Sequence, residues 1–302
     1  MSRQRCAIGI DFGGTRIKGA LVDAKGEVLK SVICDTEASA GRATVMRNIF
    51  GLIEELQPSS KNLPLGLSIP GECDTKGKVW RLPNVANFEG FQLRTALIKR
   101  LGRRPIAIDN DAICAAFAEH RLGAATKFDN FLQITLGTGI GGGLVLNGEL
   151  YRGRDGFGAE IGHIAIHNAG RKCGCGIRGC MEAYAGAAGI LKTYRSLGGR
   201  AKSVKEVSQH ASKGKKSALK CFAQVGNVLG HGLASILNTL NLEALVFSGG
   251  IRKAMKYMKP TLQETLRERC MGEPVSKLAL RLTRLGEDAG SVGAALLAMQ
   301  SK

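Results

Sequence analysis

The chain has 302 residues, of which 44% are hydrophobic, and its formal net charge is +18 at pH 7. This length and apolar content are sufficient for two folded domains and indicate a soluble globular protein. No uninterrupted apolar run of about 18 residues occurs and the first residues lack the apolar segment of a signal peptide, which excludes a membrane span and predicts a cytoplasmic protein without a membrane partner.

The Lys and Arg residues are dispersed, with local enrichment at 94–104, 213–220 and 252–269. Few aromatic side chains lie between them, although aromatic stacking is what single-stranded nucleic acid needs besides positive charge. We therefore expect no nucleic-acid partner. The charge fits either a surface that attracts anionic substrates or a compositional bias unrelated to function.

The chain begins with the apolar run CAIGI, followed by DFGGT and the alternating run RIKGALVD, which predicts two strands joined by a glycine turn. Gly13 and Gly14 allow backbone amides to converge on an anion, to which Thr15 can add a hydroxyl and Lys18 a positive charge. Asp11 could hold a hydrated Mg²⁺. The alternative is a plain hairpin turn, and no Walker pattern is present.

The following elements alternate between strands and helices, which predicts a mostly parallel α/β sheet. They are expected as strands at 27–34 and 63–69 and helices at 43–56 and 91–101. Between them the polar loop 82–91 either lines a pocket or simply turns, and its Asn84 is a candidate substrate contact.

A buried strand expected near 103–108 ends in Asp109-Asn110-Asp111, and a strongly helical run follows. A carboxylate at the carboxyl end of a strand lies where ligands bind in open α/β sheets. Asp111 is therefore the candidate general base. The alternative is that this triplet only caps the helix.

The segment 128–147 repeats the earlier pattern of strand, glycine turn and strand, with its turn at Gly137, Thr138 and Gly139. A third turn, at Gly249 and Gly250, follows an apolar strand and precedes a helix. The two similar strand-turn-strand segments indicate a duplicated core in which each half contributes one phosphate cradle. The third turn suits the packing of a nucleoside against bare backbone.

Six of the nine cysteines are scattered among apolar neighbours and are expected to be reduced, whereas Cys173, Cys175 and Cys180 gather in one glycine-rich loop. Together with an upstream histidine they provide the four ligands of a closed structural zinc site. The run HIAIH is predicted as a short strand in which His163 and His167 share one face, so either imidazole could complete the site.

Further helices are expected at 180–197, 204–211, 217–240 and 288–299.

The motifs DFGGTRIKGALVD, IDNDA, LGTGIGGG, GAEIGH, CGCGIRGCME and SGGI, spread from residue 11 to residue 251, resemble those of the ROK family of sugar kinases, bacterial glucokinases in particular. The resemblance implies a duplicated actin-like, RNase-H-like α/β fold of two domains with a cleft between them. The implied small domain is 1–117 with the last helix at 288–302, and the larger domain is 118–287. Family members are commonly dimers or tetramers.

The resemblance also implies roles for individual residues. Asp111 would be the base in ATP- and Mg²⁺-dependent phosphorylation of a hexose, and His163 would complete the zinc site, with His167 as the fallback. The implied contacts to sugar hydroxyls come from Asn110, Glu160, His163 and Glu182.

Substrate identity is less sharply implied, because Ile113, Glu72 and Cys73 depart from the family pattern. Glucose is the first expectation, followed by mannose, N-acetylated hexosamines and fructose, and polyphosphate remains an alternative donor. A sugar-responsive repressor is the competing class, but its helix-turn-helix domain would precede a strand that here begins near residue 6. A catalytically inactive sugar sensor is disfavoured by the intact Asp111 and glycine turns.

Overall fold

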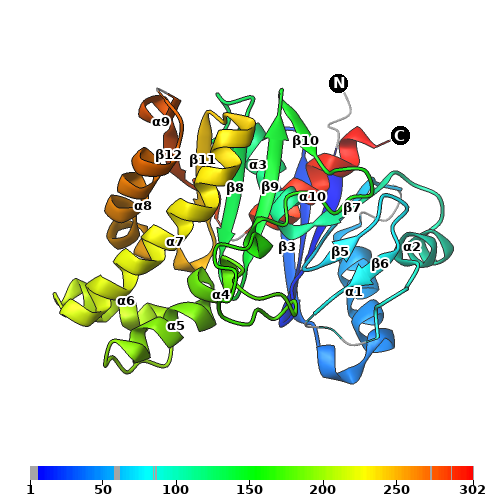
Figure 1. Ribbon diagram of the computed structural model, residues 1–302. Helices are drawn as coiled ribbons and strands as arrows, with labels where there is room; N and C mark the ends of the chain where they lie inside the picture. Colours follow the sequence, from blue (N-terminus) through cyan, green and yellow to red (C-terminus); the bar gives the residue numbers. More distant parts are fainter. Residues whose placement is uncertain are drawn as a thin grey trace. The chain divides into compact units, whose positions relative to one another are not determined.

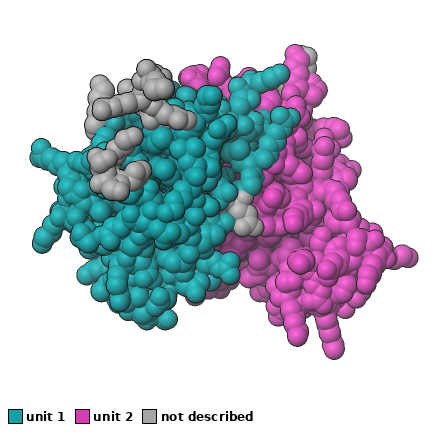
Figure 2. Space-filling view, turned by 180° about the vertical axis from the view of Figure 1, so that it is seen from behind, with its two compact units in different colours: residues 1–127, 149–158, 284–302 teal, residues 128–148, 159–283 magenta. Residues whose placement is uncertain are grey.

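The computed structural model describes residues 6–57, 62–83, 85, 87–272, 274–286 and 288–301. The chain divides into two compact units (Figure 2): unit 1 comprises residues 1–127, 149–158 and 284–302, and unit 2 comprises residues 128–148 and 159–283. The domain boundaries expected from the sequence stay a prediction. Within the described ranges, no helix is both long and apolar enough to cross a bilayer.

Unit 1 is built on a five-stranded sheet with the order β3-β2-β1-β4-β7 (Figure 1). Its strands are β1 (Cys6–Phe12), β2 (Arg16–Asp23), β3 (Val28–Asp35), β4 (Leu65–Ile69) and β7 (Ile106–Asn110). β2 is antiparallel to both β1 and β3, whereas β4 is parallel to both β1 and β7. The carboxyl ends of β1, β4 and β7 therefore meet at one edge of the sheet, where α/β proteins bind ligands.

Helices cover both faces of this sheet. They are α1 (Arg42–Leu56), α2 (Leu93–Leu101), α3 (Asp111–Leu122) and α10 (Ala289–Gln300). Neighbouring residues of β1 point to opposite faces, because side chains alternate along a strand. Ile8 belongs to the core that includes α1 and α2, and Ala7 belongs to the core that includes α3 and α10. The unit also contains η1 (Ala38–Ala40), β5 (Glu72–Cys73) and β6 (Val79–Arg81). The segment 149–158 begins with β10 (Glu149–Tyr151), which is the edge strand of the second five-stranded sheet, described below.

Glycines in the strands allow α10 to pack very close to the sheet. A Cβ on Gly9 would lie 1.8 Å from the carbonyl oxygen of Ser291, and a Cβ on Gly66 would lie 1.9 Å from that of Ala294. Any side chain at these two positions would push the helix away. This contact explains why the last helix is rich in small residues.

Unit 2 repeats the topology of unit 1. Its strands β9-β8-β11-β12 have the order and directions of β2-β1-β4-β7, with β8 antiparallel to β9 and parallel to β11. The bounds are β8 (Phe131–Leu136), β9 (Ile140–Leu146), β11 (Ala244–Ser248) and β12 (Ala279–Leu282). The duplicated α/β core expected from the sequence is therefore confirmed.

The helices of unit 2 lie around one continuous apolar core. They are α4 (Glu182–Ala185), α5 (Ala187–Ser196), α6 (Val204–Ser212), α7 (Lys216–Leu240), α8 (Met255–Arg269) and α9 (Pro274–Lys277), with the 3-10 turns η2 (Ile161–His163) and η3 (Gly250–Ala254). α7 contributes Leu229 and Leu233 to this core, where they join Ile134 of β8 and Phe247 of β11.

Two predictions of secondary structure are wrong. The helix expected at 180–197 is broken at Gly186, whose extended backbone (φ −73°, ψ 165°) begins α5. The run HIAIH is not a strand: His163 ends the 3-10 turn η2, and Ala165 makes only an isolated bridge to Cys180. Its apolar residues Ile164 and Ile166 pack against the core of unit 2, and its backbone bonds to the cysteine loop, with the Ile166 N–H donating to Gly179 O at 2.8 Å.

Candidate active site and metal cluster

The first glycine turn joins β1 to β2 and is held at its base by a buried threonine. The Gly13 N–H donates to the Arg16 carbonyl at 3.0 Å, and the Thr36 hydroxyl donates to the Gly13 carbonyl at 2.6 Å. Thr36 is fully buried, whereas Thr15 at the tip is exposed. The turn is thus fixed at its base while its tip remains open to a ligand.

Asp11 precedes this turn and is held from several sides. It lies opposite Lys18 in the β1–β2 register, and its Oδ1 accepts a hydrogen bond from Ser68 Oγ at 2.9 Å. A Cβ on Gly290 of α10 would lie 2.7 Å from the Asp11 carboxyl carbon. Burial raises the pKa of Asp11, which the Ser68 hydrogen bond and the Lys18 charge partly offset. A cation bound here would relieve the cost of ionising this carboxyl group.

The Asp109-Asn110-Asp111 triplet spans the junction of β7 and α3. Asn110 caps α3, because its Oδ1 accepts from Ala112 N at 2.8 Å while its Nδ2 donates to Gly71 O at 3.1 Å. Asp111 is the first residue of the helix and is partly exposed. The capping interpretation therefore holds for Asn110, and it leaves Asp111 at a helix N-terminus, where a negative charge is stabilised.

The second glycine turn joins β8 to β9, and Glu182 supports it. The Gly137 N–H donates to Gly139 O at 3.0 Å, and the Ile140 N–H donates to Glu182 Oε2 at 2.9 Å. A Cβ on Gly139 would lie 2.3 Å from the same carboxylate oxygen, while Thr138 at the tip is exposed. A side chain at this position would displace the Glu182 carboxylate from the turn.

The third glycine turn lies directly against the second. Gly249 has a positive φ of 80°, and a Cβ there would lie 2.2 Å from the carbonyl oxygen of Leu136, the last residue of β8. Gly250 has open space around its Cα. Beneath the turn, the buried Gln133 donates from Nε2 to Ser248 Oγ at 2.6 Å. β8 and β11 thus bring two glycine turns together at their carboxyl ends.

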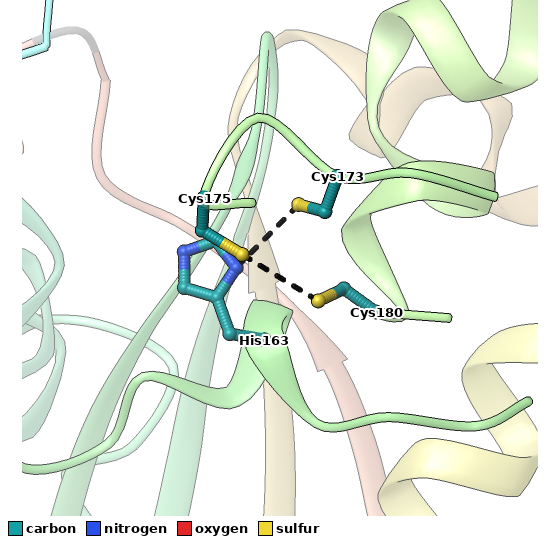
Figure 3. Close-up of side chains that lie close together, drawn as sticks. All are labelled: His163, Cys173, Cys175 and Cys180. Atoms are coloured by element: carbon teal, nitrogen blue, oxygen red, sulfur yellow. Dashed lines mark hydrogen bonds between the residues drawn. The ribbon is translucent and has the colours of Figure 1, made fainter. Parts of the chain in front are cut away.

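Four side chains of unit 2 point toward one another at the predicted metal site (Figure 3). The ligand atoms of His163, Cys173, Cys175 and Cys180 all lie within 4.8 Å of one another. His163 Nδ1 is 3.7 Å from Cys173 Sγ, and the sulfurs of Cys175 and Cys180 are also 3.7 Å apart. Ligands around a tetrahedral zinc ion are separated by roughly 3.3–3.8 Å, so the donor set and its spacing fit this metal.

The loop that carries the sulfurs is folded by tight turns of its backbone. The Cys173 N–H donates to Ile177 O at 2.9 Å, and the Gly176 N–H donates back to Cys173 O at 3.1 Å, with Gly176 at a positive φ of 94°. Gly179 also has a positive φ, and a Cβ there would lie 1.8 Å from His167 O. Glycine is therefore required at both positions for the sulfurs to converge.

The cluster of His163 and the three cysteines is connected to the second glycine turn through Glu182. Its Oε1 accepts from Cys173 Sγ at 3.4 Å, while its Oε2 holds the Ile140 amide. Burial raises the pKa of the Cys173 thiol to about 12. His163 belongs to the cluster, whereas the ring of His167 packs edge-on against Tyr184 with centroids 5.2 Å apart. Among the described residues, His163 is thus the histidine positioned with the cysteines.

The remaining predicted site residues are distributed between the two units. Unit 1 holds the candidates Asp11, Gly13, Gly14, Thr15, Lys18, Asn110 and Asp111. Unit 2 holds Gly137, Thr138, Gly139, Glu160, His163, Cys173, Cys175, Cys180, Glu182, Gly249 and Gly250. Glu160 is exposed and occupies the N-cap position of η2, where its side chain makes no cap hydrogen bond. Asn84 lies outside the described residues.

Several side chains that shape these sites were not identified from the sequence: Thr36, Ser68, Arg152 and Ser248. Ser248 directly precedes the third glycine pair, so its position was a usable signal. Ser68 lies inside an apolar strand, and only the register across β1, β4 and β7 aligns it with Asp11 and Asp109.

Comparison with known proteins agrees with these features. A sequence model of the ROK family matches residues 7–301. The glucokinase of Thermotoga maritima is 33% identical over 303 residues, which cover 95% of each chain. The xylose repressor of Bacillus subtilis is 29% identical over 291 residues, which cover 95% of this chain and 75% of the repressor.

A solved structure is similar over almost the whole chain. The ROK family glucokinase from Streptomyces griseus, in complex with glucose and AMPPNP, has a TM-score of 0.83 at 29% identity and covers 98% of this chain and 100% of its own. The duplicated actin-like α/β fold expected from the sequence is confirmed by this likeness.

Proposed function

Because the chain belongs to the ROK family, we propose that it is a hexose kinase that transfers a phosphoryl group from MgATP to glucose and forms glucose 6-phosphate. The observation that carries the proposal is the likeness, over 98% of the chain, to a glucokinase that binds glucose and AMPPNP. The alignment with the Thermotoga maritima glucokinase, which covers 95% of each chain, supports the same reaction. We also infer a cytoplasmic homodimer or homotetramer, as the family resemblance implies.

In the proposed reaction, the hydroxymethyl oxygen of the sugar attacks the γ-phosphorus, its proton passes to the Asp111 carboxylate, and ADP leaves. The partial exposure of Asp111 and its position as the first residue of α3 support this role, since they leave the carboxylate within reach of a substrate. Phosphoryl transfer otherwise needs positioning and charge stabilisation. The amides of the glycine turns and Lys18 would supply these, and Asp11 would hold the hydrated Mg²⁺ that accompanies ATP.

Sugar recognition would use Asn110, Glu160, His163, Glu182 and Asn84. His163 can serve both the metal and the sugar, because its Nδ1 faces Cys173 Sγ and its Nε2 is on the opposite side of the ring. The Glu182 carboxylate already accepts from a turn amide, so a sugar contact there would tie the substrate to the second glycine turn.

A zinc ion would have a structural role in this enzyme. The four ligands of the cluster leave no open position for a substrate or water, and their spacing supports a closed tetrahedral site. Zinc would hold the Cys173 sulfur as a thiolate and order the loop that carries Glu182. The cluster would then orient the residues that bind the sugar, without taking part in the phosphoryl transfer.

A sugar and donor panel tests the reaction. Purified protein should release ADP from MgATP with at least one of glucose, mannose, N-acetylglucosamine, N-acetylmannosamine and fructose, with glucose giving the highest kcat/KM. A parallel series with inorganic polyphosphate identifies the donor. The Asp111→Asn variant should still bind sugar in calorimetry but lose about 10²–10⁴-fold in kcat. If no sugar at saturation gives ADP release, the protein is not a hexose kinase. If the Asp111→Asn variant keeps near-normal turnover, Asp111 is not the general base.

A sugar-responsive regulator is the second candidate, and the likeness to the Bacillus subtilis xylose repressor favours it. A regulator would bind sugar without turnover. In that case calorimetry on the same panel would give a binding isotherm for one sugar while the ADP assay stayed at its background rate. Turnover above background would exclude it.

A further inference from the structure

The 149–158 loop is a segment of unit 1 that packs beside the β7–α3 junction. It begins with β10 and is closed on itself, because the Gly158 N–H donates to the Arg152 carbonyl at 2.8 Å. Gly153 has a positive φ of 70°, and a Cβ on Gly158 would lie 2.8 Å from the carbonyl carbon of Arg152. Arg152 therefore projects from a loop with a defined shape.

Arg152 uses this position to reach Asp109. Its Nε donates to Asp109 Oδ2 at 2.8 Å, and the exposed fraction is 36% for the arginine side chain but only 12% for the aspartate. Burial raises the pKa of Asp109, and the nearby Arg152 charge lowers it. The ion pair thus keeps a mostly buried carboxylate compensated. Removing one partner of such a pair costs more than removing a surface pair, because the other charge stays behind.

Asp109 lies next to Asn110 and two residues before Asp111. Asn110 joins the end of β7 to Gly71 and to the first turn of α3 through two hydrogen bonds. If Asp109 lost its partner, its carboxylate would either take up a proton or move toward water. Both changes would shift the last residues of β7. Asp111 directly follows this strand, so its position depends on where the strand ends.

We propose that Arg152 is a positioning residue for the kinase reaction: its ion pair with Asp109 fixes the end of β7 and thereby the orientation of Asn110 and Asp111. The inference depends on the proposed function, in which Asp111 is the base. Arg152 itself touches neither substrate nor the reacting atoms.

The test compares Arg152→Met, Arg152→Lys and the double variant Arg152→Met with Asp109→Asn. Arg152→Met should lower kcat by roughly tenfold or more, because small misplacements of a catalytic group are costly, with KM for ATP changed less than about twofold. Arg152→Lys should keep most of the kcat, since it keeps the charge. The double variant should recover much of the loss, because no buried charge is left unpaired.

Arg154→Met is the matched control. Arg154 lies on the same loop, but its side chain is 91% exposed and pairs with the neighbouring Asp155. This variant should retain the kcat of the unmodified enzyme. Equal losses in Arg154→Met and Arg152→Met would overturn the proposal, because they would show a general sensitivity of the loop.

Trp80 reports separately on whether the loop stays in place. It is the only tryptophan of the chain, is 51% exposed, and contacts Phe157 of the loop edge-on with ring centroids 6.2 Å apart. Its emission and its quenching by acrylamide should be the same in Arg152→Met as in the unmodified protein. A changed Trp80 signal together with no recovery in the double variant would assign the lost turnover to a displaced loop and overturn the proposal.

The unmodified enzyme, assayed first, separates the two hypotheses. If it phosphorylates no sugar, the proposed function fails. If it turns over and Arg152→Met retains its kcat, only the role of Arg152 is rejected. A drop in melting temperature without a drop in kcat would likewise reduce Arg152 to a stabilising contact.

Discussion

The buried carboxyl groups at the edge of the unit 1 sheet are costly to ionise. Burial raises the pKa of both Asp11 and Asp109 above the usual carboxyl value. The folded chain therefore binds more protons than the unfolded chain between the usual pKa and the raised one. The free energy of unfolding must then fall as the pH rises through this window. Such a cost is expected of residues kept for ligand binding and not for stability.

Replacing Asp11 tests whether its buried charge lowers the free energy of unfolding. Asp11→Asn removes the buried charge, so at pH 7 the free energy of unfolding should rise by about 1 kcal/mol and its decline with rising pH should become shallower. The same variant should lose most MgATP-dependent turnover. Urea unfolding from pH 4 to 8, with Asp155→Asn as an exposed control, measures the first effect. If Asp11→Asn is less stable than the unmodified protein at pH 7, burial is not the cause of the raised pKa of Asp11.

The cysteine loop is an element whose shape depends on few contacts of its own. It lacks a long helix or strand, and its order depends on short turns and on four side chains that converge at one point. A bound metal would supply the free energy that so small an element cannot gain from burial. Glu182 lies two residues after Cys180, and its Oε2 accepts from the Ile140 amide, so disorder in the loop would also disturb the second glycine turn.

Metal analysis tests the zinc proposal. The purified protein should contain about one zinc ion per chain, and Cys175→Ser should lose the metal together with about 2 kcal/mol or more of unfolding free energy. Cys270→Ser is the control, since Cys270 is also partly buried in unit 2 but lies outside the cluster. A Cys175→Ser variant with unchanged zinc content and melting temperature would reject the site.

At the scale of the whole molecule, 43 basic residues outnumber 25 acidic ones. The resulting positive potential attracts anions over distances longer than any single contact, and salt screens it. The positive potential should attract an anionic nucleotide, whereas it should have little effect on a neutral hexose. We therefore expect the excess charge to aid capture of an anionic phosphoryl donor.

Salt dependence separates this role from compositional bias. Raising NaCl from about 50 to about 300 mM should increase KM for MgATP several-fold, while KM for the hexose changes by less than about twofold. The hexose series serves as the internal control. Equal changes in both constants would show that salt acts on the enzyme as a whole, and the charge would then have no special role in donor binding.

The sequence predicted the elements that depend on local pattern. Apolar alternation located β1 and β2, helical spacing located α1 and α7, and the glycine pairs marked all three turns. Two predictions were wrong because distant residues override the local pattern. A Cβ on Gly186, where the expected helix breaks, would lie 3.0 Å from Thr138 O, and the backbone of HIAIH bonds to residues 179 and 181 and not to a sheet. Residues 72–73 and 79–81, which form β5 and β6, were too short to show a period.

By itself the sequence determined the duplicated α/β core, the three glycine turns and the three cysteines of the predicted metal site, because periodicity, backbone freedom and ligand chemistry are properties of neighbouring residues. Only the structure places His163, and not His167, with these cysteines. Only the tertiary structure decided which side chains support them. Thr36 is 23 positions from Gly13, Ser68 is 57 from Asp11, and Arg152 is 43 from Asp109. These pairs meet through strand register and loop packing, and no short-range pattern in a single sequence encodes that register.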